Sequence, residues 1–285
     1  MFYIDKLQKN ISLAPYTTFK IGGPAKYFYI AKTIEDLINA VGAARKAMVL
    51  FFILGAGSNI LVSDKGFDGL VIKIQNTNYK IQNTKIVTEA GTRLGDLTLV
   101  SVEAGLTGLE WAAGIPGSIG GVIRGNAGAF GGSMADITKT VKVLEPKIRN
   151  PKSKTFKNQD CKFGYRDSIF KHNKNLIIFS AELELKKGDK KSSREMIKRY
   201  LKKRRETQPL EYPSAGSVFK NPANQAAGCL IEKRGLKGKK IGGAMISEKH
   251  ANFIVNLGGA KAGDVIKLIN ICKEKVKEKF GIDLE

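Results

Sequence analysis

The alternation of apolar and polar residues predicts short strands around one amphipathic helix at the start of the chain. Tyr16 to Ile21 and Tyr27 to Ile30 have the pattern of strands bounded by turn residues. From Thr33 to Lys46 the apolar residues recur on one helix face, and Thr33 is suited to cap that helix. The continuous apolar run Val49 to Leu54 is short enough for a buried strand.

The same patterns continue to the end of the chain. Ile60 to Ile74 alternates like strands around a turn, and a polar segment, 145–160, separates two later strands. The remaining expected strands are Ile86 to Glu89, Val141 to Leu144, Leu176 to Leu185 and Phe253 to Asn256; the remaining expected helices are Gly91 to Val102, Ser193 to Glu206 and Ala262 to Phe280.

Two glycine-rich segments stand out from this pattern. Gly114 to Gly132 reads GIPGSIGGVIRGNAGAFGG, and its interleaved apolar residues indicate a packed segment rather than a flexible linker. Gly55 to Asn59 reads GAGSN and follows an apolar run. Glycine permits close backbone approach, and free N–H groups in such loops bind anions, so we expect a phosphate-bearing ligand. Tight turns between strands are the alternative. Neither segment matches GxxxxGK[ST], and Ile60 stands where a third dinucleotide-binding glycine would be.

Composition indicates a globular chain with two or three modest domains. Of its 285 residues, 42% are hydrophobic, and no apolar run reaches membrane-spanning length. The first ten residues are polar, so we expect no signal peptide and a cytoplasmic protein. The isolated Cys161, Cys229 and Cys272 argue against a disulfide framework and a zinc site, and neither His172 nor His250 is a convincing catalytic candidate.

A net charge of +22 favours anionic partners. Much of it comes from single lysines, which is the pattern of ordinary solvated positions. The basic helix Ser193 to Glu206 keeps open a non-catalytic nucleic-acid-binding protein, although most such helices are surface helices. Trp111, the only tryptophan, is expected in the core.

Five segments, in order, resemble the UDP-N-acetylenolpyruvoylglucosamine reductase family. They are APYTTFKIGGPA, LGAGSNILVSD, GIPGSIGGVIRGNAGAFGG, FGYRDSIFK and PSAGSVFKNP, and they extend over nearly the whole chain. The compact connection after FGYRDSIFK is similar to the shorter of the family's two types. The resemblance implies an α+β fold: a two-subdomain FAD-binding module of the vanillyl-alcohol-oxidase type followed by an α+β substrate domain. The implied boundaries are 1–75, 76–207 and 208–285.

The resemblance also implies the chemistry and the residues that perform it. NADPH would reduce FAD, and reduced FAD would pass hydride to the enolpyruvyl double bond of a UDP-sugar. Arg166 matches the family's enolate-stabilising arginine and Ser217 its proton donor. Tyr165, Lys220 and Asn221 match positions that hold the sugar nucleotide. The positions expected to bind FAD are Gly55, Ala56, Gly57, Ser58, Asn59, Gly114, Ile115, Pro116, Gly117, Ser118, Gly121, Asn126, Gly128 and Ala129. Simpler alternatives are a surface ion pair for Arg166 with Asp167 and a turn role for Ser217.

Two departures from the family pattern stand beside this expectation. The sequence given ends at GIDLE, before the family's Pro-Glu-Val-Arg-like run with its catalytic glutamate, so Glu285 inherits no role. A truncated chain, a substituting carboxylate and an impaired flavoprotein all stay open. Arg124-Gly125 replaces a bulkier apolar pair, a difference that bears on flavin packing or redox tuning. Another oxidoreductase on the same scaffold is the remaining enzymatic alternative. We expect a monomer that binds its small-molecule substrates and neither nucleic acid nor membrane.

Overall fold

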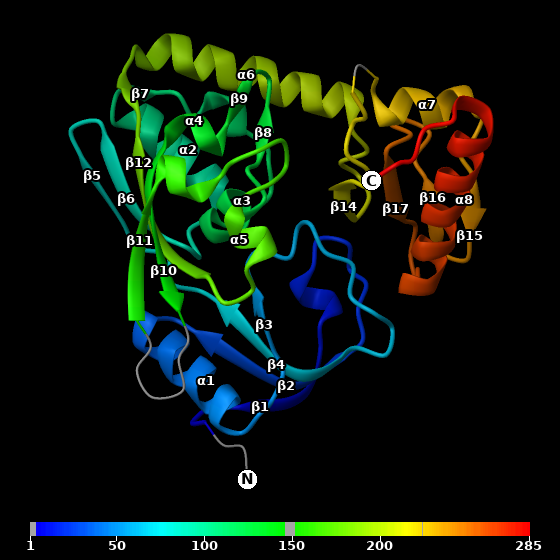
Figure 1. Cartoon of the computed structure of the whole chain (residues 1–285). Helices are drawn as coiled ribbons and strands as arrows, with labels where there is room; N and C mark the ends of the chain where they lie inside the picture. The colour runs from blue at the N-terminus through cyan, green and yellow to red at the C-terminus, as the bar shows by residue number, and fades with distance from the viewer. Residues whose placement is uncertain (1–3, 146–151, 224) are drawn as a thin grey trace. The chain divides into compact units, whose positions relative to one another are not determined.

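The computed structural model describes residues 4–145, 152–223 and 225–285, which form two compact units (Figure 1). Unit 1 comprises the described residues up to Asn10, together with Lys26–Ala56 and Asp68–Lys202. Unit 2 comprises Ile11–Ala25, Gly57–Phe67 and Lys203–Glu285. The domain boundaries expected after residues 75 and 207 stay predictions.

Unit 1 is built on two sheets. A 4-stranded sheet has the order β1-β2-β4-β3, in which β3 and β4 are parallel. A 5-stranded sheet has the order β11-β10-β12-β6-β5, and its neighbouring strands are antiparallel. The strands are β1 (Gln8–Ser12), β2 (Pro24–Ala31), β3 (Phe51–Leu54), β4 (Phe67–Ile74), β5 (Tyr79–Gln82), β6 (Lys85–Glu89), β10 (Thr138–Glu145), β11 (Lys152–Lys157) and β12 (Ile177–Glu184).

Among the described residues, two short strand pairs and six α-helices complete the strands and α-helices that lie wholly or mostly in this unit. The pairs are β7 (Leu106–Thr107) with β13 (Lys186–Lys187), and β8 (Gly128–Ala129) with β9 (Gly132–Ser133). The helices are α1 (Ile34–Lys46), α2 (Leu94–Glu103), α3 (Ile119–Arg124), α4 (Met134–Ile137), α5 (Ile169–His172) and α6 (Lys190–Thr207). A continuous cluster of buried apolar side chains extends from Leu70 of β4 through Ile86 of β6 to Val141 of β10. This shared core holds both sheets in one unit.

Helix α1 confirms the expected cap. The Thr33 side chain accepts a hydrogen bond from the Asp36 N–H at 3.0 Å, and the Asp36 carboxylate accepts one from the Thr33 N–H at 3.1 Å. This reciprocal pair satisfies backbone donors that the first helical turn leaves without partners. The apolar face that the sequence predicts is buried through Leu37 and Val41.

Among its described residues, unit 2 contains a second 4-stranded sheet, β14-β17-β16-β15, and two α-helices that lie wholly within it. Its elements are β14 (Ser214–Ser217), β15 (Lys240–Ile241), β16 (Ala244–Ile246), β17 (Phe253–Asn256), α7 (Ala227–Lys233) and α8 (Ala262–Phe280). The Asp64 carboxylate accepts hydrogen bonds from the N–H groups of Ala262 and Gly263 at 2.8 and 3.0 Å. A carboxylate at this end stabilises α8 and ties the segment after GAGSN to this unit.

Some expected strands are wrong. Tyr16 to Ile21 forms no strand: a 3₁₀ turn, Ala14–Tyr16, leads into irregular backbone, and Phe19 and Ile21 are apolar because they pack in the core of unit 2. Ile60 to Ser63 is also irregular, and only β4 forms within the alternating run. The expected buried strand β3 lies at the edge of its sheet, with Phe52 42% exposed.

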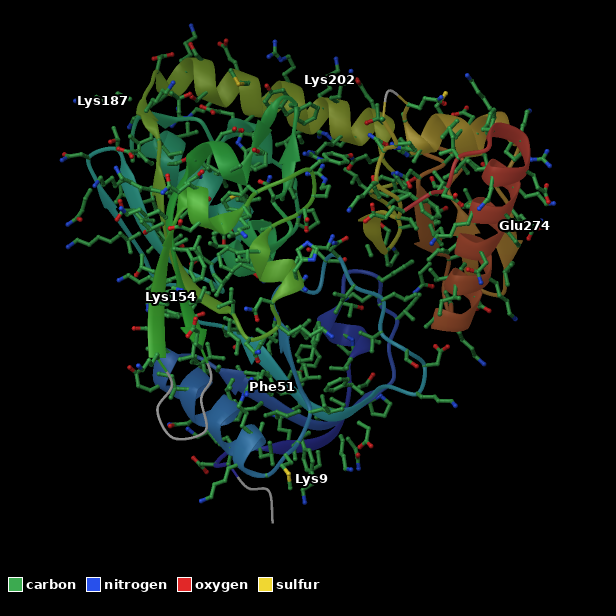
Figure 2. All side chains as sticks on the ribbon, in the orientation of Figure 1. Lys9, Phe51, Lys154, Lys187, Lys202 and Glu274 are labelled. Atoms are coloured by element: carbon green, nitrogen blue, oxygen red, sulfur yellow. The ribbon has the colours of Figure 1, made fainter. Side chains whose placement is uncertain are left out.

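The polar connection between the later strands contains a strand that periodicity missed. β11 pairs with β10 at the edge of the 5-stranded sheet, and its lysines face solvent. Figure 2 shows Lys9, Lys154, Lys187 and Lys202 directed away from the ribbon, and all four are exposed. At these positions the lysines are solvated, as the distribution of single lysines predicts. Trp111 is buried, which confirms its assignment to the core.

A buried carboxylate attaches α6 to the rest of unit 1. Glu110, only 3% exposed, accepts hydrogen bonds from Ser193 Oγ at 2.5 Å, Thr107 Oγ1 at 2.7 Å and the Gly108 N–H at 2.8 Å. Burial acts to raise the pKa of Glu110, but these hydrogen bonds outweigh it and lower the pKa below its ordinary value.

None of the described helices combines the length and apolar character needed to cross a membrane.

Replacing this carboxylate is expected to destabilise the fold. Glu110→Ala should lower the free energy of unfolding by about 2–4 kcal/mol, because buried donors lose their acceptor. Since the folded-state pKa is depressed, the contribution of Glu110 is present above its ordinary pKa and is lost as pH falls through the folded-state value. Urea unfolding measures the free energy of unfolding at pH 7 and at pH 4. Between these two pH values, Glu110→Gln should lose less of this free energy than the wild type. Glu103→Gln, which alters an exposed ion pair with Arg194, is the control. If both variants lose the same free energy of unfolding on acidification, the stabilising role assigned to Glu110 is contradicted.

Candidate functional site

The glycine-rich stretch Gly114 to Gly132 forms a turn, helix α3 and the β8–β9 hairpin in sequence. Its first part lies along the start of α2, where the Leu94 N–H donates to the Gly117 carbonyl at 3.0 Å. The Ile119 N–H donates to the Thr92 carbonyl at 2.9 Å. These bonds fix the backbone of the turn that leads into α3.

The two glycine-rich segments meet at Ser118. The Ala56 N–H donates to Ser118 Oγ at 3.3 Å, and a Cβ on Gly55 would lie 2.3 Å from that oxygen. A side chain at residue 55 would displace the Ser118 hydroxyl from this hydrogen bond. The structure therefore brings together Gly55, Ala56 and Ser118, three of the positions that the resemblance assigns to FAD.

The rest of the GAGSN segment, Gly57 to Asn59, belongs to unit 2. The Gly57 carbonyl accepts a hydrogen bond from the Thr18 N–H at 3.1 Å, and Gly57 has a φ of +67°. A side chain there would strike the Tyr16 carbonyl, so this position requires glycine.

A cavity of about 280 Å³ lies in unit 1 beside Arg166. Most of its lining comes from the glycine-rich stretch and from the turn that carries Arg166. The lining residues are Asn126, Gly128, Gly132, Ser133, Gly164, Tyr165 and Arg166. It thus gathers one expected catalytic residue, one expected substrate-binding residue and two expected cofactor-binding residues.

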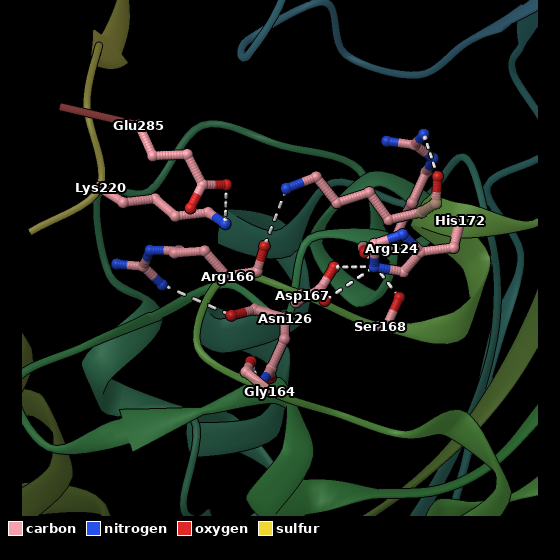
Figure 3. A network of polar contacts seen from close by, with 10 residues as sticks. Arg124, Asn126, Gly164, Arg166, Asp167, Ser168, His172, Lys220 and Glu285 are labelled. Atoms are coloured by element: carbon pink, nitrogen blue, oxygen red, sulfur yellow. Dashed lines mark hydrogen bonds and ion pairs between the residues drawn. The ribbon is translucent and has the colours of Figure 1, made fainter. Parts of the chain in front are cut away.

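The Arg166 guanidinium is held by backbone carbonyls. Its Nη2 donates to the Gly128 carbonyl at 2.6 Å. Its Nη1 donates to the Asn126 carbonyl at 3.4 Å, the contact drawn in Figure 3. A guanidinium carries five N–H donors, so these two bonds leave further donors for an anionic ligand. Asp167 pairs with His172 at 2.8 Å, and the Arg166–Asp167 ion pair considered as an alternative is not among the described contacts.

Arg166 has a left-handed backbone with a φ of +55°. It lies at the tip of a two-residue turn closed by Gly164 and Asp167, whose backbones exchange hydrogen bonds of 3.0 and 3.2 Å. This conformation is rare for a branched or long side chain and is retained where surrounding contacts determine it. The carbonyl contacts of the guanidinium are such a determinant.

Asn126 joins the parts of this cavity. Its amide Nδ2 donates to the Gly164 carbonyl at 2.8 Å, and its Oδ1 accepts from the Ala135 N–H at 2.9 Å. Asn126 is buried, so both ends of its side chain find the partners that a buried amide requires. It therefore fixes the Arg166 turn to the glycine-rich stretch.

The other expected residues lie in unit 2. Ser217 ends β14 and is exposed. Lys220 forms an ion pair with the Glu285 carboxylate, and the Lys220 N–H donates to the Glu285 carbonyl at 2.8 Å. Asn221 Oδ1 accepts from the Ala227 N–H at 3.1 Å, at the start of α7. Ser217, Lys220 and Asn221 thus lie on one short segment.

Two basic residues near Ser118 were missed by the sequence analysis. Lys73, on β4, donates from Nζ to the Gly55 carbonyl, and Arg93 forms an isolated β-bridge with Ser118. Burial, with a further contribution from the positive charge of Arg93, lowers the pKa of Lys73. No sequence motif marks either residue, because the contacts join segments distant in sequence.

Two observations indicate that the residues of unit 1 can accommodate an FAD diphosphate. The Gly55 backbone closely approaches Ser118 Oγ, which a Cβ at residue 55 would overlap, and two positive charges lie where the glycine-rich segments meet. Backbone concavities and cations of this kind suit a phosphate ligand.

Family models match two parts of the chain. Residues 25–147 match an FAD binding domain, and residues 208–285 match the UDP-N-acetylenolpyruvoylglucosamine reductase C-terminal domain. Cholesterol oxidase from B. sterolicum is 11% identical, with a TM-score of 0.52 over 65% of this chain and 38% of that one, which supports the fold alone. The two matched domains define an FAD-dependent oxidoreductase.

Full-length relatives narrow this class. UDP-N-acetylenolpyruvoylglucosamine reductase of Syntrophomonas wolfei is 44% identical over 283 residues, covering 99% of this chain and 93% of the relative. That of Caldicellulosiruptor bescii is 45% identical, covering 97% and 88%. The Thermus caldophilus reductase structure has a TM-score of 0.83 at 36% identity, covering 98% and 97%. The chain belongs to the UDP-N-acetylenolpyruvoylglucosamine reductase family.

Filling the space at Gly55 is expected to weaken FAD binding. Gly55→Ala places a Cβ against Ser118 Oγ, and relieving this overlap should raise the Kd for FAD roughly tenfold. Titration of the apoprotein with FAD, followed by flavin fluorescence, measures this change.

Gly42→Ala is the matched control. A Cβ at Gly42 meets no heavy atom within 4 Å, and the residue lies inside α1. This substitution should leave the Kd unchanged and stabilise the helix by about 0.5–1 kcal/mol. Equal FAD affinity in both variants would show that the Gly55 contact is irrelevant to the cofactor.

Proposed function

We propose that the chain reduces UDP-N-acetylglucosamine enolpyruvate to UDP-N-acetylmuramate with NADPH, through FAD, in peptidoglycan precursor synthesis. The observation that carries this proposal is the combination of an FAD-binding module with a family-specific C-terminal domain at residues 208–285. The cavity around Arg166 supports it. Another oxidoreductase on the FAD scaffold would not explain the C-terminal match, and the full-length relatives favour an active reductase over an impaired flavoprotein.

Bound FAD would supply the chemistry that moves hydride from NADPH to the enolpyruvyl carbon. The backbone of Gly55 to Asn59 and of Gly114 to Ser118 is assigned to the FAD diphosphate. Gly121 and the segment Asn126 to Ala129 are assigned to the rest of the cofactor. The close approach at Gly55 and the rigid turn before α3 support these assignments.

Arg166 is assigned to the substrate carboxylate. Adding hydride to the double bond leaves negative charge that spreads into this carboxylate, and a permanently charged guanidinium stabilises it through parallel hydrogen bonds. The carbonyl contacts of Arg166 support this role because they orient the guanidinium before substrate binds. Tyr165, which lines the same cavity, is assigned to the sugar nucleotide.

Ser217 is assigned as the proton donor to the carbanion carbon of the developing enolate, which is the neighbour of the carbon that receives hydride. A serine is a weak acid, so this transfer requires a strongly basic carbanion and the exclusion of water when substrate is bound. Lys220 and Asn221 are assigned to the nucleotide diphosphate. The Lys220–Glu285 ion pair supports a cation at this position, which an anionic substrate would engage in competition with the carboxylate.

The wider setting of the reaction is also part of the proposal. A monomeric, cytoplasmic enzyme that binds neither nucleic acid nor membrane is consistent with small-molecule substrates and with the helices described above. The excess of positive charge suits anionic substrates and cofactors.

Anaerobic spectroscopy tests the reaction directly. The visible flavin bands of the purified protein should bleach with NADPH and return after addition of the enolpyruvyl UDP-sugar. Bands that bleach and do not return would contradict the second half-reaction. A protein that stays colourless after incubation with FAD would contradict the whole proposal.

Substitution of Ser217 separates the two half-reactions. Ser217→Ala should leave bleaching by NADPH unchanged and slow reoxidation by the UDP-sugar about 10²–10⁴-fold, because only the second step needs the proton donor. Stopped-flow absorbance measures both rates. Ser214→Ala, on the same strand, should reoxidise at the wild-type rate; if Ser217→Ala does so too, Ser217 is not the donor.

A further inference from the structure

The peptide that links Gly55 and Ala56 is held at both of its polar ends. Its carbonyl accepts a hydrogen bond from Lys73 Nζ, and its N–H donates to Ser118 Oγ at 3.3 Å. Because the carbonyl and the N–H belong to one planar unit, these two contacts fix its orientation. The first peptide of the GAGSN segment is therefore set by side chains outside it.

Lys73 reaches this peptide from the neighbouring strand. β3 and β4 are parallel, and Leu54, the last residue of β3, lies in register with Lys73 of β4. From this position the Lys73 side chain reaches the loop that follows β3, where its Nζ donates to the Gly55 carbonyl. It is half-buried, between the buried residues Ile72 and Ile74. A half-buried ammonium is costly without an anion, since burial disfavours its charged form.

A second positive charge, that of Arg93, is close enough to Lys73 to lower its pKa further. Arg93 is exposed, and its β-bridge to Ser118 places it beside the Ser118 backbone. In the part of the chain that the structure describes, no carboxylate forms an ion pair with Lys73 or Arg93. Two positive charges thus converge, without an acidic partner, where the two glycine-rich segments meet. This arrangement attracts a multivalent anion.

We propose that Lys73 is a positioning residue of the FAD site: it orients the Gly55–Ala56 peptide against Ser118 and, with Arg93, supplies positive charge to the FAD diphosphate. The inference deepens the proposed function and depends on the cofactor assignment made there. It explains why a lysine occupies a half-buried place on β4 that would otherwise suit an apolar residue.

Lys73→Met tests the proposal on the apoprotein, without turnover. Loss of a hydrogen bond and a charge should raise the Kd for FAD about 10–100-fold, measured by flavin fluorescence. The Kd should also depend less on KCl concentration than in the wild type, because one charge facing the diphosphate is gone. At saturating FAD the visible spectrum should match the wild type, since the change lies away from the flavin ring.

Two further variants define the controls. Lys73→Gln is a second uncharged side chain, for use if Lys73→Met does not fold, and the thermal unfolding of each apoprotein reports folding. Lys26→Met removes an exposed lysine that pairs with Asp68, and it should leave both the Kd and its salt dependence unchanged.

The proposal is overturned if the uncharged variants bind FAD as tightly as the wild type. It is also overturned if they bind more weakly with an unchanged salt dependence, because Lys73 would then act through the fold alone. A wild-type protein that binds no FAD contradicts the proposed function itself, whereas wild-type binding with unaffected variants contradicts only the role of Lys73.

Discussion

The site of unit 1 depends on close backbone packing within and around one glycine-rich stretch. A Cβ on Gly132 would lie 2.4 Å from the Trp111 ring, and one on Gly55 would lie 2.3 Å from Ser118 Oγ. The Trp111 ring and the Ser118 hydroxyl thus pack directly against glycine backbone, in a dense interior. The β8–β9 hairpin and the turn before α3 are thereby fixed relative to the core of unit 1. Trp111 therefore supports the site from the core and is not assigned to ligand binding.

This rigidity explains how Arg166 retains an unfavourable backbone conformation. Its φ of +55° costs of the order of 1–3 kcal/mol in a non-glycine residue. The cost is offset by the Gly128 carbonyl, which is fixed by the hairpin, and by Asn126, which holds the turn at Gly164. The guanidinium is therefore oriented before any ligand binds. Preorganised charge of this kind stabilises a developing anion more than mobile charge does.

The sequence predicted the elements whose signals are local. Helix α1 was predictable because its cap and its apolar face lie within one segment, and helix α8 and strand β17 follow the expected ranges. Tyr16 to Ile21 has a strand-like pattern without forming a strand because its apolar residues pack in a distant core. Strand β11 lacks a strand-like pattern because an edge strand rich in lysine has no apolar periodicity. The glycine-rich segments could be predicted as ligand loops by their composition. The roles of Arg166 and Ser217 came only from the resemblance.

The positions of Lys73 and Arg93 beside the glycine-rich segments could not be predicted from the charge of the sequence. A net charge of +22 is distributed over so many exposed lysines that its magnitude does not locate a site. Exposed charges are screened by water and salt, so each contributes little to a bound anion. A half-buried lysine beside a like charge is different, because its positive charge is poorly solvated and a bound diphosphate would compensate it. Half-burial, and the lack of an ion-paired carboxylate among the described residues, therefore distinguish Lys73 from a solvated lysine, and both become visible only when β3, β4 and the turn before α3 are placed side by side.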